Sequence, residues 1–267
     1  MSESALLTRV EGHVLTITLN RPEKKNAVNA EVLCGLRDAW HRFDRDDALR
    51  VAILTGAGGV FCAGMDLSVI GKLVSRKADD EYEKRLLEEP SLIFEGWLKT
   101  FRPGKPVIAA VEGFALAGGT EILQGTDVRV AGESAVFGVT EVQRGLFPMA
   151  GSAVRLQRQI PYAAAAEMLL TGEPIDARRA AALGLVGRVV PDGEALNEAR
   201  RLAARIAENG PVAVRAILAT LRETAALPEA EAFAIEMRHG AAVMASEDAR
   251  EGPRAFLEKR PPIFRGR

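Results

Sequence analysis

Two short apolar segments, each followed directly by a glycine-rich loop, constrain the fold of this chain most strongly. Residues 51–55 lead into a glycine-rich loop at 56–64, and residues 106–111 lead into another at 113–119. Short apolar runs bounded by glycine are typical of strands that are buried on both faces. Such strands need helices on both sides of their sheet, so the pattern predicts an α/β fold.

The rest of the chain continues this alternation of strand, loop and helix. Residues 14–19 alternate like a half-buried strand with a hairpin partner at 5–10, and apolar residues from Val32 to Phe43 recur at helical spacing. Further strands are expected at 127–131, 135–137 and 186–190, and further helices at 78–101, 164–170, 177–182, 195–208, 212–226 and 230–244. We therefore expect an α/β core at residues 1–192, built from stacked β-β-α turns or a parallel sheet, and a helical region at 193–267.

Composition and charge exclude several classes of protein. The chain has 267 residues, of which 48% are hydrophobic and 27% charged, as in folded globular proteins. Because 35 Lys and Arg residues face 36 Asp and Glu residues, its net charge of −1 predicts no nucleic-acid partner. The apolar tract at 107–119 contains Glu112 and falls short of the ~18 residues of a spanning helix, so no membrane segment is expected.

The cysteines and the first residues indicate the compartment. Cys34 and Cys62 lie far apart and lack the spacing of a metal site or a redox pair. The first residues, MSESALLTRVEGHV, lack the charged start and apolar stretch of a signal peptide. A cytoplasmic protein without a bound metal is the expectation.

Several common catalytic motifs are absent or incomplete in the sequence. The loop after residue 55 resembles a dinucleotide fingerprint, but Phe61 replaces its third glycine. The sequence has neither a phosphate-binding GxxxxGK[ST] loop nor a GxSxG nucleophile elbow, and its three histidines, His13, His41 and His239, are isolated. We assign the histidines no catalytic role.

The two glycine-rich loops are candidates for a site that stabilises an oxyanion. A helix is expected to begin near Gly118, where free N–H groups and the helix dipole stabilise negative charge, with Glu121 on the same face. The loop around Gly64 could supply a second N–H group, because both loops leave neighbouring strands. Spacing alone leaves the alternative open that both loops are close-packed turns, that Glu121 is an acid favoured in a first helical turn, and that Glu141 is a surface carboxylate.

Seven motifs in order resemble the crotonase superfamily, also called the enoyl-CoA hydratase/isomerase superfamily. They are LNRPEKKNA at 19–27, FCAGMDL at 61–67, KPVIAAVEG at 105–113, ALAGGTE at 115–121, FG at 137–138 with Glu141, LLTG at 169–172 and AALGLV at 181–186. Each is weak alone, but their order and spacing cover nearly the whole chain.

The resemblance implies a fold, an assembly and a substrate. The fold would be a crotonase-like spiral of β-β-α turns with a C-terminal helical region that forms a homotrimer or a dimer of trimers. The substrate would be an acyl-CoA thioester, so coenzyme A enters as part of the substrate and no metal or redox cofactor is implied.

The resemblance also implies site residues. The N–H groups of Met65 and Gly118 would form the oxyanion hole, and Glu121 and Glu141 would be the catalytic acid and base. Substrate and CoA contacts would come from Lys25, Ala27, Ala63, Gly64, Met65, Asp66, Leu67, Gly118, Phe256 and Lys259. The alternative for Lys25 is that it lies in a solvated turn. Phe256 and Lys259 would reach the CoA of a neighbouring subunit, and the alternative for them is that they only pack their helix.

Paired glutamates suit the hydration of an unsaturated thioester, because one holds and deprotonates water while the other protonates Cα. We therefore expect an enoyl-CoA hydratase of fatty-acid metabolism that adds water reversibly, in the syn sense, to a trans-2-enoyl-CoA. The alternatives are an enoyl-CoA isomerase, a carnitinyl-CoA dehydratase and a catalytically silent CoA- or RNA-binding paralogue. Met65, Ala117 and Met149 depart from the usual hydratase pattern, and residues 141–149 are similar to those of members that handle carnitinyl-CoA, so the acyl group stays open.

Overall fold

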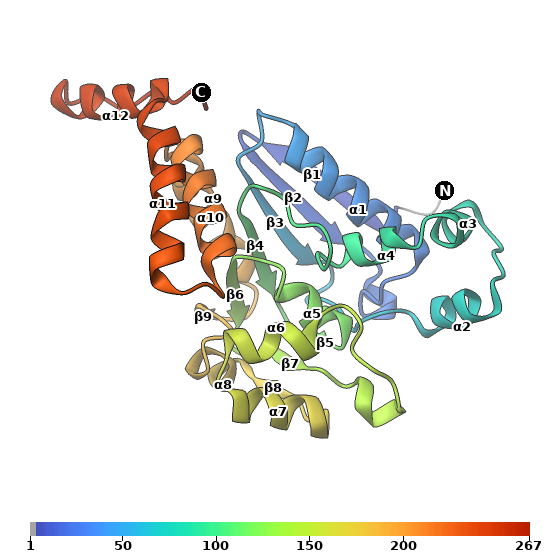
Figure 1. Cartoon of the computed structure of the whole chain (residues 1–267). Coiled ribbons are helices and arrows are strands. Elements are labelled where there is room, and N and C mark those ends of the chain that lie inside the picture. Colours follow the sequence, from blue (N-terminus) through green and yellow to red (C-terminus); the bar gives the residue numbers. More distant parts are fainter. Residues whose placement is uncertain (1–3) are drawn as a thin grey trace.

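The computed structural model describes residues 4–267, which form an α/β core and an arm of C-terminal helices (Figure 1). The strands are β1 (Leu6–Glu11), β2 (Val14–Leu19), β3 (Val51–Gly56), β4 (Val107–Val111), β5 (Phe114–Leu116), β6 (Val128–Gly132), β7 (Val136–Gly138), β8 (Ile175–Asp176) and β9 (Arg188–Val190). The α-helices are α1 (Ala30–Arg45), α2 (Leu67–Ser75), α3 (Glu81–Glu88), α4 (Ser91–Gly96), α5 (Gly118–Leu123), α6 (Ser152–Gln159), α7 (Tyr162–Thr171), α8 (Ala177–Ala182), α9 (Ala195–Ala207), α10 (Pro211–Thr224), α11 (Glu229–Met244) and α12 (Glu247–Leu257). Two short 3-10 helices are η1 (Pro22–Lys24) and η2 (Glu141–Arg144).

The strands form two sheets through which the chain winds repeatedly. The larger sheet has the order β1-β2-β3-β4-β6-β9 and is parallel except for the β1–β2 hairpin, while the smaller sheet has the order β5-β7-β8. β4 and β6 of the larger sheet are each followed within a few residues by β5 and β7 of the smaller one. β3 is followed in the same way by Cys62, which bridges to Ala115 of β5. This winding confirms the expected spiral of β-β-α turns.

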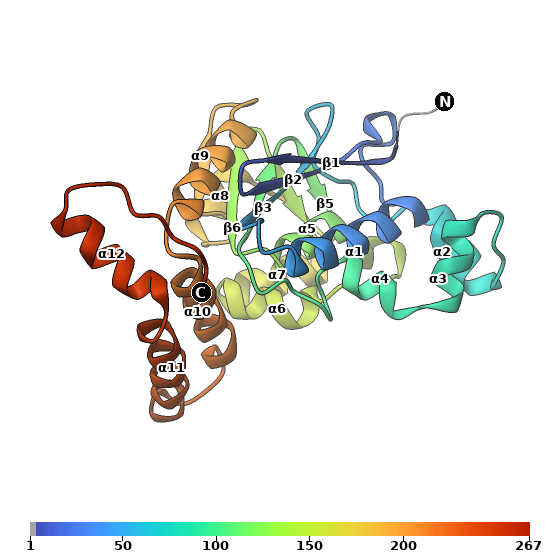
Figure 2. The same ribbon diagram turned by 90° about the horizontal axis from the view of Figure 1, so that it is seen from above.

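Helices cover the larger sheet as its doubly buried strands require. Trp40 and Phe43 of α1 are fully buried in the main core. α9 presents alanines at every fourth position, such as Ala199 and Ala203, to the apolar residues of β3, β4 and β6. α9 therefore packs on the core although it follows Asp192, whereas α10, α11 and α12 extend outward (Figure 2). The division of the chain at residue 192 stays a prediction.

The prediction of one continuous helix at 78–101 was wrong, because this segment forms two separate helices, α3 and α4. Pro90 lies between α3 and α4, and a proline lacks the N–H group that a continuous helix needs at this position. The loop at 113–119 also contains a strand, β5, which pairs with β7 in parallel. Strands of three residues carry too little periodicity to be read from sequence alone.

Candidate active site

The two glycine-rich loops touch each other beyond the ends of β3 and β4. Gly64 has φ +98°, and a Cβ atom there would lie 2.8 Å from Ala117 Cβ and 3.2 Å from the Gly118 nitrogen. Only glycine combines this backbone conformation with such a close approach. The loops that the sequence placed on neighbouring strands are thus in direct contact.

Each loop offers a backbone donor. Val28 pairs with the loop around Met65 through the Gly64 oxygen, which accepts the Val28 N–H at 2.8 Å, and through the Asp66 N–H, which donates to the Val28 oxygen at 2.9 Å. In such a parallel bridge the N–H of the residue in between, Met65, faces away from Val28. Gly118 is the first residue of α5, so its N–H has no acceptor within the helix. Within residues 4–267 neither N–H group has a backbone acceptor, and the pair suits an oxyanion.

Glu121 is buried and is held by the start of another helix. Its side chain is 3% exposed, and its Oε1 and Oε2 atoms accept the N–H groups of Ser152 at 3.0 Å and Ala150 at 3.1 Å. Burial raises the pKa of Glu121, while these backbone donors oppose the rise. Because Ser152 begins α6, the dipole of that helix also favours a carboxylate here.

Glu141 lies at the start of η2 and interacts with Glu121. Burial raises the pKa of Glu141 to about 7, and the negative charge of Glu121 adds to the rise. Its Oε2 atom is buried and has no hydrogen-bond partner among residues 4–267. One carboxyl group is therefore anchored by donors and the other keeps an oxygen for a proton or a ligand.

The turn at residues 21–27 lies against the first loop. The Ala63 N–H donates to the Lys25 oxygen at 3.0 Å, and Lys25 Nζ lies 5.5 Å from the centre of the Phe114 ring. Arg21 Nη1 donates to the Ala27 oxygen at 2.5 Å and pairs with Asp66 at 3.1 Å. Asp66 in turn caps α2, which begins at Leu67. The turn at 21–27 and the loop around Gly64 are thus in direct contact, and the roles of these residues in binding CoA stay a prediction.

Comparison with known proteins identifies the family. The family model described as enoyl-CoA hydratase/isomerase matches residues 9–267. The chain belongs to this family. It is 54% identical over 98% of its length to enoyl-CoA hydratase EchA19 of Mycobacterium tuberculosis, of which 97% is covered. It is 39% identical, over all of both chains, to a carnitinyl-CoA dehydratase of Salmonella enteritidis.

Solved structures of the enoyl-CoA hydratase/isomerase family have the same fold. Enoyl-CoA hydratase EchA1 from Mycobacterium marinum superposes with a TM-score of 0.89 at 44% identity, covering 99% of this chain and 100% of that one. A putative enoyl-CoA hydratase/isomerase from Mycobacterium abscessus gives a TM-score of 0.88 at 46% identity, with 98% and 100% covered. The resemblance to the crotonase superfamily is confirmed.

Two predicted CoA contacts lie away from this site. Phe256 is on α12 and is 83% exposed, and Lys259 follows the end of that helix. Both views place α12 on the helical arm, away from α5, which carries Glu121 (Figures 1 and 2). One chain does not bring Phe256 and Lys259 to the glutamates, so their contact with the CoA of a neighbouring subunit stays a prediction.

The sequence did not reveal the groups that orient the glutamates. The N–H groups of Ala150 and Ser152 are backbone donors and carry no side-chain signature. Thr120 of α5 also joins this helix to β5 and β7. Its hydroxyl donates to the Ala115 oxygen at 2.5 Å and accepts the Gly138 N–H at 3.0 Å. Gly151 followed by Ser152 is a helix-start signal that could have located α6.

Other chemistry has little support in the described part of the chain. Burial raises the pKa of Cys62 to about 12 and that of Cys34 to about 11, so neither thiol is a nucleophile at neutral pH. Between residues 4 and 267, His, Cys, Asp and Glu side chains form no group of three that could hold a metal ion. No helix in that range is long and apolar enough to span a bilayer.

Proposed function

We propose that the protein is an enoyl-CoA hydratase that adds water reversibly, in the syn sense, to a trans-2-enoyl-CoA and yields a 3-hydroxyacyl-CoA. The observation that carries the proposal is the interacting pair of Glu121 and Glu141, anchored differently, beside two free N–H groups. Hydration needs a base and an acid at adjacent carbon atoms, and this pair supplies both.

The different environments of the glutamates assign their roles. The backbone donors stabilise Glu121 as a carboxylate, so it accepts a proton from the water whose oxygen bonds to Cβ. Glu141, with its pKa raised to about 7, carries the proton that it donates to Cα. The C=C double bond becomes a single bond, and proton transfer between the two carboxyl groups restores the starting state.

The oxyanion donors stabilise the charge that develops in between. As water adds at Cβ, electron density moves onto the thioester oxygen, which becomes enolate-like. The N–H groups of Met65 and Gly118 would each donate to that oxygen, and losing one such donor typically costs roughly 3–4 kcal/mol of barrier. Coenzyme A enters as part of the substrate, and this mechanism uses no metal or redox cofactor.

Isotope labelling tests the reaction directly. Crotonyl-CoA incubated in water labelled with oxygen-18 and deuterium should give 3-hydroxybutyryl-CoA with the heavy oxygen on Cβ and deuterium on Cα. The Glu141→Gln variant should still bind the substrate but not incorporate the label. Migration of the double bond without labelled oxygen would refute hydration and indicate an isomerase.

A carnitinyl-CoA dehydratase is the second candidate. The match to such a dehydratase over both full chains and the similarity of residues 141–149 favour it. Both reactions remove or add water at the same carbon atoms, so the acyl group decides between them. The ratio of kcat/KM for crotonyl-CoA to that for crotonobetainyl-CoA should exceed one for a hydratase and fall below one for the dehydratase.

We also propose that the protein works as a homotrimer or a dimer of trimers in the cytoplasm. Apolar residues of the helical arm support the assembly, because they are exposed in the single chain: Ile217, Leu221, Phe233 and Met237 are each more than half exposed. Light scattering coupled to gel filtration should give a mass that is a multiple of three protomers. A stable monomer at micromolar concentration would refute this assembly.

A further inference from the structure

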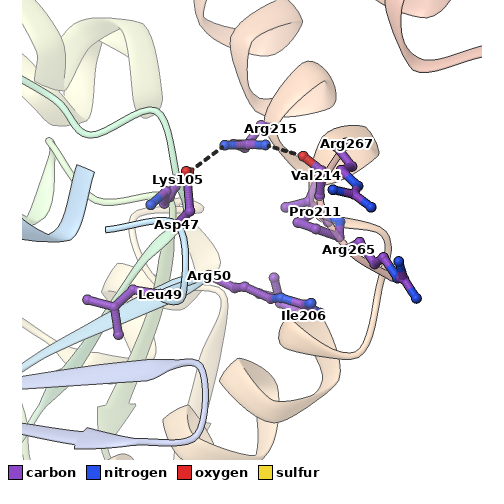
Figure 3. Close-up of a pocket in the computed structure, with 11 residues that line it drawn as sticks. Asp47, Leu49, Arg50, Lys105, Ile206, Pro211, Val214, Arg215, Arg265 and Arg267 are labelled. Carbon is purple, nitrogen blue, oxygen red and sulfur yellow. Dashed lines mark hydrogen bonds and ion pairs between the residues drawn. The ribbon is translucent and has the colours of Figure 1, made fainter. Parts of the chain in front are cut away.

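A cavity of about 210 Å³ lies between the core and the C-terminal tail (Figure 3). Arg50 just before β3, Lys105 just before β4, Arg215 of α10 and Arg265 of the tail line it. At about 30 Å³ per water molecule, this space holds roughly seven waters or a small oxyanion. We call it the seam pocket.

The lining of the seam pocket is strongly cationic. Five Lys and Arg residues line it, of which Arg267 pairs with Glu247 at 3.1 Å, and Asp47 is the one acidic residue of the lining. Asp47 is weakly engaged, since its Oδ1 lies 3.8 Å from Arg215 Nη1 and its side chain is 94% exposed. The whole chain carries a net charge of only −1, so this concentration of positive charge is local.

The innermost cations have only neutral partners. Lys105 is 4% exposed, and its ammonium donates to the backbone oxygens of Phe43 at 2.9 Å and Asp46 at 2.8 Å. Arg50 donates to the backbone oxygens of Ala207 and Phe264 at 2.8 and 2.9 Å. Neither side chain forms an ion pair among residues 4–267, although the charges of Asp44, Asp46 and Asp47 favour the protonated form of Lys105. A buried charge without a direct ionic partner costs free energy.

The other acidic groups near Lys105 are engaged by the backbone. The Asp44 carboxylate accepts the Gly104 N–H at 2.6 Å, and the Asp46 carboxylate accepts the Ala48 N–H at 3.0 Å. The backbone oxygen of Arg267 accepts the Glu247 N–H at 2.7 Å, which holds the tail at the start of α12. These hydrogen bonds hold the carboxylates in place without neutralising them, so Asp44 and Asp46 still offset part of the positive charge at Lys105.

The start of α10 adds to the positive potential. Pro211 is the first residue of this 14-residue helix and lines the pocket, and Gly210 before it provides no side-chain cap. The free N–H groups and the dipole of a helix start attract anions. Cationic side chains, a helix start and a cavity thus coincide.

We propose that the seam pocket binds a multiply charged oxyanion of the phosphate class. Such a ligand would pair with Arg50, Lys105 and Arg265, which form no ion pair within residues 4–267, and would join the tail and α10 to the core. Because β3 and β4 are parallel, Arg50 and Lys105 at their amino ends lie at the opposite end of these strands from the loops that carry Met65 and Gly118. The site is therefore separate from the one that handles the thioester.

Calorimetry and thermal melting at constant ionic strength test the proposal. Inorganic phosphate, pyrophosphate and ADP are titrated separately into the full-length protein, with sodium chloride as the reference. At least one should bind saturably and raise the melting temperature, and the strongest of the three identifies a free oxyanion or a nucleotide as the source. Saturation with inorganic phosphate should leave hydration of crotonyl-CoA unchanged, so loss of hydratase activity alone does not affect this conclusion. ADP and pyrophosphate resemble part of coenzyme A, so their binding counts for the seam pocket only where the variants below weaken it.

Charge-removing variants locate the binding. Arg215→Gln combined with Arg265→Gln should weaken binding at least tenfold, whereas Arg178→Gln, an exposed change on α8, should leave it unchanged. If the double variant does not fold, Arg265→Gln alone serves, since that side chain lies on the exposed tail. The absence of saturable binding for all three ligands at millimolar concentration, or equal binding by the folded variant and the parent, would overturn the proposal.

Discussion

Replacing Glu141 by glutamine should abolish hydration and yet stabilise the fold at alkaline pH. Burial and the charge of Glu121 raise the pKa of Glu141 from 4.5 to about 7. At about 1.4 kcal/mol per pKa unit this rise corresponds to roughly 3 kcal/mol, and partial solvent exposure reduces it to roughly 2 kcal/mol. The ionised Glu141 therefore destabilises the folded state by that amount, and a neutral amide removes the penalty.

The free energy of unfolding should depend on pH in a direction set by the raised pKa of Glu141. Below pH 4.5 the carboxyl group is protonated in both the folded and the unfolded chain, so it costs nothing. Between pH 4.5 and about 7 the unfolded chain loses this proton before the folded protein does, and stability falls as pH rises. Above about 7 the penalty is complete, so the advantage of Glu141→Gln should be largest at pH 8 and absent near pH 4.5.

Thermal unfolding at several pH values, at equal protein concentration, measures this advantage. Roughly 2 kcal/mol corresponds to a rise in melting temperature of about 4–8 °C for a chain of this size. The exposed Glu173→Gln is the matched control and should show no such pH-dependent gain. If Glu141→Gln is no more stable than the parent at pH 8, or if its advantage does not depend on pH, the raised pKa and the role of Glu141 as proton donor are both wrong.

Three further predictions concern the same site. Glu121→Gln should lower kcat by about 10²- to 10⁴-fold, and the double change with Glu141→Gln should be little worse than the poorer single variant; additive losses in stopped-flow assays would contradict a shared role. Met65→Pro removes the N–H donor and should lower kcat by about 10²-fold or more, with folding checked by calorimetry. Met65→Ala keeps the donor and should keep turnover but change the preference among acyl chain lengths. Parent-like rates in the folded proline variant would exclude the donor role. Gly118→Ala should lower both kcat and melting temperature, because its Cβ would lie 2.7 Å from the Trp97 ring and such overpacking costs about 1–3 kcal/mol; an unchanged melting temperature would show that the ring moves aside freely.

The fold could be predicted from the sequence where one local pattern determined the structure. The strands at 51–55 and 106–111 were predicted because an apolar run ending in glycine has few other solutions, and both are present as β3 and β4. The break at Pro90 had a local signal in the proline itself, whereas the two- and three-residue strands of the smaller sheet depend on neighbours distant in the chain. Local periodicity does not contain that information.

The candidate site was predictable only in its side chains and glycines. Gly118 stood out as the expected start of a helix and Gly64 as the residue of a turn, and the φ of +98° at Gly64 and its approach to Ala117 explain why glycine is needed there. The donors that hold Glu121 lie 29 and 31 residues further along the chain and belong to the backbone. A hydrogen bond from a backbone N–H depends on the path of the chain and not on which side chain the residue carries, so these two bonds could not be predicted from residue types.

Those backbone donors also explain why the side chains of Glu121 and Glu141 differ in their tendency to hold a proton. Burial raises the pKa of both glutamates, and without other contacts the pair would share one proton symmetrically. The N–H groups of Ala150 and Ser152 stabilise only the charged form of Glu121, and that charge then raises the pKa of Glu141. In the proposed mechanism the start of α6 therefore sets which carboxyl group acts as base and which as acid. We expect a change that moves α6 to alter the direction of proton transfer without touching either glutamate.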